Sequence, residues 1–403
     1  MKNHHKFLII SYNFPPDPSV GSRRWAKFAK YLVAGGNRVT VLSAASASKK
    51  SPWDQDVQGI KVIRLPQRYP SVLNKTPTSI FEKIAYRYWI FILKLLKRGT
   101  IYDRGIFWKK QLIASVKKII AEDKIDIVIV NGPPHRLIYY TAALKQEFPE
   151  VKFWCDLRDP WTWWYNMGYA HLKPADKKFE LNMERTAITN MDRVFVPIVD
   201  MKKVLDEKYP ELSNKIEILP HGFDPDDIQV KLQQNGEKCI RLIYFGSLYL
   251  GLDEFYSKLL QWLVQQNGKV TLDIFTSDSN YSDIFKRTNH IRIHSPLSSR
   301  EIFKVAATYD YFLLVYPEQF KNYFATKFYE LVAAKIPIVY VGHKGETSVF
   351  IEDKRLGYYF NVENPDFDAM MKSLEGKNAF ACNDDFIGDY NFKNLVARLQ
   401  PNG

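Results

Sequence analysis

Short apolar runs alternate with segments of helical periodicity along most of the chain, and proline, glycine or asparagine marks the joints. Between the first two runs, Trp25, Phe28, Ala29 and Leu32 recur at i, i+3, i+4 and i+7, and a glycine pair follows. This pattern predicts a helix between two strands, and hence a parallel sheet. In the first half of the chain, runs of strand length lie at residues 7–10, 39–42, 125–130, 151–155, 193–198 and 216–219.

The pattern restarts after a polar stretch at residues 224–238, and helical segments such as 301–307 and 326–334 separate most of the later runs. A chain of 403 residues also exceeds what one hydrophobic core usually supports. We therefore expect two α/β domains, residues 1–230 and 231–385, with a final helical segment at 386–403 that finishes the second domain or returns to the first. The later strand-like runs are 240–245, 270–275, 291–294, 311–315, 336–341 and 357–360.

Residues 44–110 break this rhythm and are interpreted as an insertion. Within it, residues 81–99 predict an amphipathic helix with two alternative roles: a core-facing helix with a solvated basic face, or a helix in a membrane interface. The apolar face comprises Phe81, Ile84, Ala85, Tyr88, Ile92, Leu95 and Leu96, and the basic residues are Lys83, Arg87, Lys94, Lys97 and Arg98.

Composition excludes several classes of protein. A hydrophobic fraction of 46% excludes a largely disordered chain. The three cysteines, Cys155, Cys239 and Cys382, lie far apart without metal-ligand spacing, which argues against a disulfide framework or a zinc site and favours a cytoplasmic setting. The first apolar run is too short for a signal peptide, and no run is long enough to span a bilayer, so we expect a soluble or peripheral membrane protein.

The net charge of +13, with 15% aromatic residues, indicates an anionic partner. Nucleic acid, phosphorylated substrates and an acidic lipid surface all satisfy this charge. No recognisable nucleic-acid module is present, so we expect no nucleic-acid partner.

Loops that follow the strands are the first candidates for a site, because ligands of open α/β sheets bind beyond the carboxyl ends of the strands. The loop PPDPSVGSRRW at residues 15–25 begins a helix with two arginines, where the helix dipole disfavours positive charge. An anion near Gly21 and Arg24 would compensate, and a surface turn with solvated arginines is the alternative. The loop matches neither the P-loop nor the dinucleotide fingerprint.

Two further loops in the first half carry chemistry. His135 follows a strand, where it could contact a sugar hydroxyl or phosphate or shuttle a proton, or serve a structural role. The stretch DLRDPW at 156–161 supplies Asp156 and Asp159 as candidate catalytic carboxylates, with Arg158 and Trp161 as candidate acceptor-binding residues. An internal ion pair between Arg158 and one of these carboxylates is the alternative.

In the second half, Gly246 and Ser247 follow a strand and permit backbone contact with a phosphate. Thr326 is a candidate N-cap, and Lys327 lies in the first turn of the same helix, where a cation opposes the dipole. Glu330 could accept hydrogen bonds from both hydroxyls of a ribose.

Together, NFPPDPSVGSRRW, GGNRVTVLSA, LPHGFD, YFGSL, TKFYELVAAKIPIVYVG and NFKNLVARL resemble the family 4 type of GT-B glycosyltransferases, in the family's order over nearly the whole chain. The resemblance implies two Rossmann-like domains with parallel sheets that face an interdomain cleft, with a final helix that crosses back. It implies transfer of a sugar from a nucleotide-sugar donor, usually with retention and without a metal or other cofactor. Glu330 matches the ribose-binding glutamate, Gly21 the glycine-loop contact and His135 the sugar-contacting histidine.

Two departures from the family pattern stand out. Asn322 lies eight positions before Glu330, where the family has a second glutamate, and Ser247, Leu248 and Tyr249 replace its diphosphate-binding basic residues. Lys327 and Arg24 are candidates to supply the missing charge. We expect a glycosyltransferase of surface polysaccharide or glycoconjugate assembly, acting on a glycan or lipid-linked acceptor at the inner face of the membrane. A catalytically silent GT-B protein and a nucleotide-sugar epimerase are the alternatives.

Overall fold

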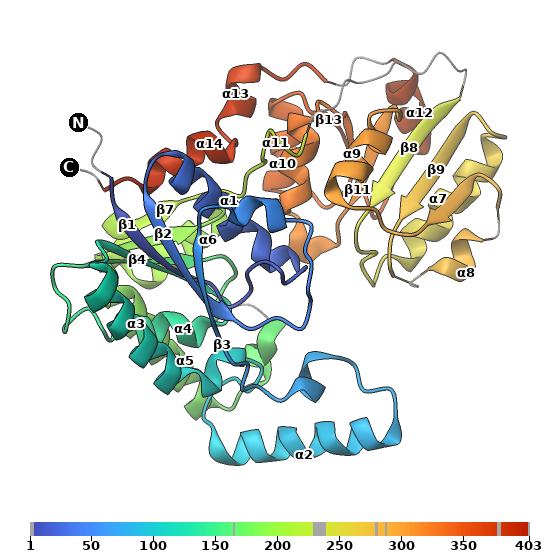
Figure 1. Ribbon diagram of the computed structural model, residues 1–403. Helices are drawn as coiled ribbons and strands as arrows, with labels where there is room; N and C mark the ends of the chain where they lie inside the picture. The colour runs from blue at the N-terminus through green and yellow to red at the C-terminus, as the bar shows by residue number, and fades with distance from the viewer. Residues whose placement is uncertain are drawn as a thin grey trace. The chain divides into compact units, whose positions relative to one another are not determined.

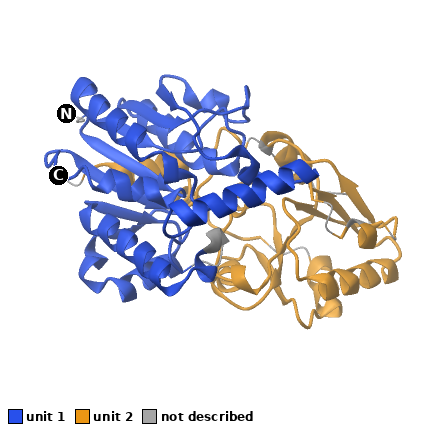
Figure 2. Cartoon of the chain, turned by 90° about the horizontal axis from the view of Figure 1, so that it is seen from below, with its two compact units in different colours: residues 1–220 blue, residues 221–403 orange. Residues whose placement is uncertain are grey.

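The computed structural model describes residues 4–163, 166–228, 239–278, 281–286, 288–376 and 380–401. The chain divides into two compact units, Met1–Pro220 and His221–Gly403, coloured separately in Figure 2. The expected domain boundary at residue 230 lies outside the described residues and stays a prediction.

Unit 1 is built on a seven-stranded sheet with the order β3-β2-β1-β4-β5-β6-β7 (Figure 1). Every neighbouring pair is parallel. The strands are Lys6–Ile10 (β1), Arg38–Ala44 (β2), Lys61–Leu65 (β3), Ile127–Gly132 (β4), Lys152–Leu157 (β5), Arg193–Val196 (β6) and Ile216–Ile218 (β7).

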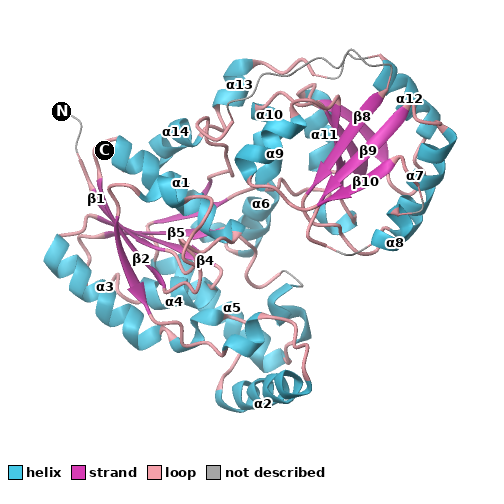
Figure 3. Cartoon of the chain, turned by 45° about the vertical axis from the view of Figure 1, so that its right-hand side comes forward, coloured by secondary structure: helices cyan, strands magenta, loops and turns pink. Residues whose placement is uncertain are grey.

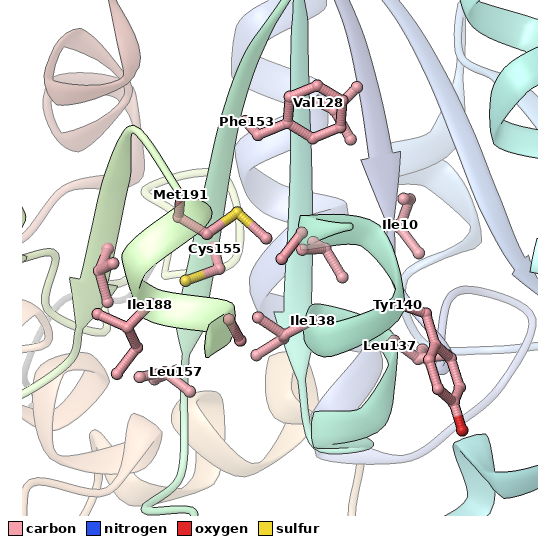
Figure 4. Close-up of a cluster of buried hydrophobic side chains, with 14 of the residues drawn as sticks. Ile10, Val128, Leu137, Ile138, Tyr140, Phe153, Cys155, Leu157, Ile188 and Met191 are labelled. Atoms are coloured by element: carbon pink, nitrogen blue, oxygen red, sulfur yellow. The ribbon is translucent and has the colours of Figure 1, made fainter. Parts of the chain in front are cut away.

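Helices of unit 1 bury the sheet. Leu8 and Ile10 of β1 join side chains of α3, α4, α5 and α6 in one apolar cluster, part of which Figure 4 shows around Cys155. The alternate residues Phe7 and Ile9 point to the opposite face and are buried as well, so both faces are covered. The helices are Val20–Ala34 (α1), Ile80–Leu96 (α2), Lys109–Asp123 (α3), His135–Ala142 (α4), Pro174–Asn190 (α5) and Val199–Lys208 (α6).

Unit 2 repeats this architecture with a six-stranded parallel sheet in the order β10-β9-β8-β11-β12-β13 (Figure 3). Leu242 and Tyr244 of β8 belong to one buried cluster, and Ile243 and Phe245 to another, so this sheet is also covered on both faces. The strands are Ile240–Phe245 (β8), Val270–Phe275 (β9), Ile291–His294 (β10), Tyr311–Val315 (β11), Ile338–Gly342 (β12) and Gly357–Asn361 (β13). The helices are Asp253–Gln265 (α7), Ser282–Phe285 (α8), Ser299–Ala306 (α9), Thr326–Ala333 (α10), Glu346–Asp353 (α11), Phe367–Glu375 (α12), Asp384–Gly388 (α13) and Phe392–Leu395 (α14).

The predicted fold class, two Rossmann-like units with parallel sheets, is confirmed. The sequence analysis missed β3, which lies inside the presumed insertion and pairs with β2. The core-facing interpretation of residues 81–99 is wrong, because the apolar stripe of α2 is largely exposed. The return of the final segment to the first domain, and a cleft between the domains, stay predictions. No helix in the described part of the chain is long and apolar enough to span a bilayer.

Candidate functional site

Each sheet has a topological switch point, which is the position where the connections that follow two neighbouring strands leave in opposite directions. In unit 1 it lies between β1 and β4, and in unit 2 between β8 and β11. Ligands of open α/β sheets bind in the crevice beyond the strand ends at this point. Gly246 and Ser247 follow β8 directly, and His135, three residues beyond the end of β4, is the first residue of the next helix, α4.

Arg24 and Asp156 are brought together in unit 1 as a buried ion pair. Arg24 donates from Nε to Oδ2 of Asp156 at 2.8 Å and from Nη2 to Oδ1 at 3.0 Å. Arg24 also donates to the carbonyls of Leu219 and Pro220, both at 2.8 Å, and Trp25 Nε1 donates to Oδ2 of Asp156 at 2.8 Å. The pair therefore ties the start of α1 to the end of β5. A donor contact for Arg24 and a catalytic role for Asp156 stay predictions.

Gly21 and Arg158 also meet, although 137 positions separate them. Arg158 Nη1 donates to the Gly21 carbonyl at 3.2 Å, and a Cβ on Gly21 would lie 2.9 Å from that nitrogen. Arg158 forms an ion pair with Asp159 at 3.1 Å, as the alternative interpretation expected, and both side chains are partly exposed. The start of α1 thus contacts the loop after β5 through a partly exposed cation.

His135 is the first residue of α4 and is buried against Trp161, with ring centroids 5.1 Å apart and planes 13° from parallel. Its Nε2 lies 3.0 Å from the Asp159 carbonyl, which can only accept, so Nε2 donates. Burial lowers the pKa of His135 below its usual value, which favours the neutral ring. Nδ1 is then the accepting nitrogen, suited to a hydroxyl donor.

Trp161 is 3% exposed, and its Nε1 donates to Oε2 of Glu180 at 2.9 Å. Its ring is therefore used inside unit 1, where it stacks on His135. A direct stack of Trp161 on an acceptor sugar stays a prediction, and the contact that the structure shows is the stack on His135.

Lys327 and Gly246 come together in unit 2. Lys327 Nζ donates to the carbonyl of Phe245, the last residue of β8, at 3.0 Å. It lies 5.0 Å from the ring centre of Tyr244 and 5.6 Å from that of Phe312. Gly246 has a φ of +114°, a value that residues with a side chain rarely adopt. A Cβ at this position would lie 2.9 Å from Nζ of Lys327. The glycine thus lets the backbone turn directly beside the ammonium.

The charge of Lys327 is poorly compensated within the protein. Among the described residues it forms no ion pair, and it lies in the first turn of α10, where the helix dipole disfavours a cation. Burial lowers its pKa to about 8. An ammonium has three N–H donors, and the hydrogen bond to the Phe245 carbonyl uses one of them. A bound anion would satisfy the charge and the remaining donors.

The other predicted donor-binding residues of unit 2 are Ser247, Thr326 and Glu330. Ser247 follows Gly246 and is exposed. Thr326 is the first residue of α10, but the prediction that it is the N-cap is wrong, because Ala325 occupies that position and no side chain caps the helix. Glu330 lies one turn further along α10 and is 5% exposed. Their contacts with a donor stay predictions.

Arg104 is a candidate that sequence reasoning missed. Its Nη2 donates to Oδ1 of Asn13 at 3.2 Å, and the guanidinium covers the Tyr12 ring at 4.8 Å. Both contacted residues lie in the loop after β1, so the fold brings a cation from the 44–110 region to this strand end. The separation of 91 residues leaves no local signal in the sequence. No cluster of potential metal ligands occurs within the described ranges.

Comparison with known proteins gives a result at the level of structure. The sequence matches no family model and no curated protein. A glycosyltransferase from Rickettsia africae ESF-5 superposes with a TM-score of 0.62 and 13% identity, over 98% of this chain and 97% of that one. The fold is that of the GT-B glycosyltransferases.

Two further structures show how broad the GT-B fold is. The lipopolysaccharide outer core galactosyltransferase WaaB has a TM-score of 0.56 and 12% identity, with 98% of each chain covered. A Listeria monocytogenes protein described as a UDP-N-acetylglucosamine 2-epimerase has a TM-score of 0.53 and 13% identity, covering 98% of this chain and 95% of that one. The GT-B fold therefore carries more than one chemistry, and the activity has to be argued from the residues.

Asn322 occupies a structural position in this GT-B chain. Its Oδ1 accepts from the backbone N–H of Glu346 at 2.9 Å, in the first turn of α11. An amide oxygen suits this contact with the positive end of a helix. The side chain that replaces the expected glutamate thus helps to start α11.

Proposed function

We propose that this chain is a glycosyltransferase that moves a sugar from a nucleotide-sugar donor to a glycan or lipid-linked acceptor in surface polysaccharide or glycoconjugate assembly. The observation that carries the proposal is the Lys327 ammonium beside Gly246, at the end of β8 and next to β11. Among the described residues, no carboxylate forms an ion pair with this ammonium at the strand end. Its positive charge is therefore free to attract an anion. The GT-B fold and the likeness to WaaB support the same activity.

The chemistry gives this ammonium a catalytic role. The acceptor hydroxyl forms a bond to the anomeric carbon while the bond from that carbon to the diphosphate breaks, and the hydroxyl proton passes to the departing diphosphate. Negative charge grows on the leaving group, so a fixed cation stabilises the transition state more than the ground state. We assign this role to Lys327, and the ribose of the donor to Glu330. Retention of configuration is part of the proposal.

Unit 1 is assigned to the acceptor. His135 presents an accepting Nδ1 when its Nε2 donates to Asp159, and Arg158 supplies a partly exposed cation. Trp161 acts through His135, because the stacked rings fix the imidazole plane. These assignments predict contacts with sugar hydroxyls rather than a nucleophilic attack by the enzyme.

The affinity for nucleoside diphosphates is expected to fall as the pH rises through about 8. Lys327 is protonated below its pKa of about 8 and loses its charge above it. The dissociation constant of UDP or GDP should therefore increase about tenfold between pH 7 and pH 9, as for one required proton. Isothermal titration calorimetry measures this change. Lys327→Arg keeps the charge throughout this range and should flatten the profile; a slope that persists in this variant would assign it to another group.

A thermal-shift panel tests the proposed donor class. A ligand that binds only the native state raises its stability, by about 2.7 kcal/mol at one hundred times its dissociation constant. We expect nucleoside diphosphates and sugar nucleotides to stabilise the protein, monophosphates to do so less, and nucleosides hardly at all. Equal shifts with nucleosides and diphosphates would contradict an anion site at Lys327.

Glu330→Gln sharpens the same panel. Glutamine keeps the volume of the side chain but loses the carboxylate that accepts from both ribose hydroxyls. The variant should lose stabilisation by ribonucleoside diphosphates and retain that by inorganic pyrophosphate, which has no ribose. An equal loss for both ligands would indicate damage to the fold instead.

An epimerase is the second candidate, favoured by the likeness to the Listeria protein. Conversion of a sugar nucleotide without any acceptor would support it. Acceptor-dependent release of the nucleoside diphosphate would support the transferase. Donor binding without turnover under either condition would identify a catalytically silent GT-B protein.

A further inference from the structure

The helix α2 presents a long apolar stripe to solvent. Ile84, Tyr88, Phe91 and Leu95 follow one another at i, i+4, i+7 and i+11, so they share one face. Their exposed fractions are 60%, 57%, 65% and 69%, and Phe81 at the start of the helix is 80% exposed. Figures 1 and 3 show α2 at the margin of unit 1, away from its sheet. Contiguous exposure of this kind marks an interaction surface.

The opposite side of α2 is firmly held by unit 1. Leu93 is fully buried in a small cluster with Tyr69 and Ile101, against which Ile90 and Phe107 pack. The helix also begins with a complete capping box between Ser79 and Glu82. α2 is therefore a fixed element whose exposed face is set by the fold.

A row of positive charge flanks the apolar stripe. Lys83, Arg87 and Lys94 lie at i, i+4 and i+11, on the side of the stripe next to Phe91. In the described part of the protein, none of the three forms an ion pair with a carboxylate. Glu82, the single acidic residue of α2, is engaged at the helix start by Lys75 and the backbone of Thr78 and Ser79. The exposed face is thus apolar and cationic.

A basic pocket of about 280 Å³ continues this row at the carboxyl end of α2. Lys94, Lys97 and Lys173 line it, together with Asp176, whose Oδ1 accepts from the Gly99 N–H at 3.1 Å. Lys94 and Lys97 also compensate the negative end of the helix dipole. Lys173 lies at the start of another helix, α5. Its positive charge therefore adds to the charge that compensates the dipole at the carboxyl end of α2.

We propose that α2 docks on the surface of a bilayer that contains anionic phospholipids. The stripe enters the boundary between headgroups and acyl chains, while the basic row and the pocket contact headgroup phosphates. Two other partners fit this surface less well. A second copy docked through the same face would bring two basic rows together. A nucleic acid would leave the apolar stripe without a partner. The inference goes beyond the proposed function, because it concerns binding without donor or acceptor.

Vesicle flotation of the full chain tests the proposal. With vesicles of equal parts phosphatidylcholine and phosphatidylglycerol at low salt, we expect the protein to float with the lipid. Pure phosphatidylcholine should retain much less. Salt at about 1 M shortens the Debye length to about 3 Å and should release most of the protein from the anionic vesicles.

Two sets of variants separate charge from apolar contact. Replacing Lys83, Arg87 and Lys94 by glutamine should weaken partitioning about a hundredfold, at about 1 kcal/mol for each charge near an anionic surface. Phe91→Ser with Leu95→Ser should weaken it at least about tenfold by loss of apolar burial. Matched controls on unit 2 should change it little. They replace the exposed Lys269, Lys304 and Lys372 by glutamine, or the exposed Leu250 and Val264 by serine.

Three outcomes would overturn the inference. One is equal flotation with neutral and anionic vesicles, and another is an equal effect of the control variants. The third is a dimer in sedimentation velocity without lipid that Phe91→Ser with Leu95→Ser converts to a monomer, because α2 would then be a contact between copies. Circular dichroism and the UDP thermal shift of each variant show that unit 1 and unit 2 remain folded.

Discussion

Replacing Lys327 with methionine is expected to lower kcat/KM for the nucleotide-sugar donor by about 10²–10³-fold, the usual loss when one preorganised transition-state donor is removed. The ammonium donates to the Phe245 carbonyl and lies over the rings of Tyr244 and Phe312. Methionine fills a similar volume and removes an opposed cation from the first turn of α10. Stability should therefore hold or rise while activity falls. Release of the nucleoside diphosphate in the presence of acceptor measures the rate.

Two control variants separate the effect of losing a positive charge from the effect of its position. Lys327→Arg retains the charge and should recover part of the rate, whereas Lys321→Met removes a partly exposed lysine of the same unit and should leave the rate unchanged. If Lys327→Met and Lys321→Met reduce kcat/KM equally, general electrostatic attraction explains the effect. If neither reduces it, the donor site lies elsewhere.

Arg24→Ala is expected to lower the free energy of unfolding of unit 1 by about 3–5 kcal/mol, the cost of breaking a buried pair and leaving one charge alone. Arg24 is 2% exposed and Asp156 is fully buried. The substitution also removes the donors to the carbonyls of Leu219 and Pro220 at the end of the unit. Urea unfolding followed by tryptophan fluorescence measures the loss. From the sequence, this arginine was expected at a donor phosphate; the buried pair predicts that folding suffers first.

Two further variants test whether the buried ion pair of Arg24 and Asp156 accounts for the loss of unfolding free energy. Arg158→Ala breaks a partly exposed ion pair in the loop after β5 and should cost less than about 1 kcal/mol. The double variant Arg24→Met/Asp156→Asn removes both charges and should be more stable than Arg24→Ala. A double variant as unstable as the single one would show that packing of α1, rather than the unpaired carboxylate, is responsible.

Candidate site residues could be proposed from the sequence where the signal is local, and their roles stay predictions. Lys327 was identified because a cation in the first turn of a helix opposes the dipole, and Gly246 because it follows a strand directly. The same argument applied to Arg24, yet Asp156, 132 positions away, supplies the anion from within the protein. A cation in the first turn of a helix indicates that a negative charge lies near it. The sequence does not show whether that charge belongs to a ligand or to the chain.

The amphipathic pattern of α2 shows the same division. Periodicity fixed which side chains share a face, but a stripe that packs on a core and one that meets solvent have the same spacing. Contacts of Leu93 with Tyr69 and Ile101 decided which side faces inward. Arg104 and Asn13 met through the fold without any local sign.

The sequence by itself determined the alternation of strands and helices, the two parallel sheets and the loops that follow each strand, because these depend on the apolar period and on residues a few positions apart. The tertiary structure alone decided which charges are neutralised internally, which apolar stripe remains exposed and which distant residues meet at a strand end. Electrostatic compensation and burial depend on neighbours in space. In this chain those neighbours lie up to 196 residues apart.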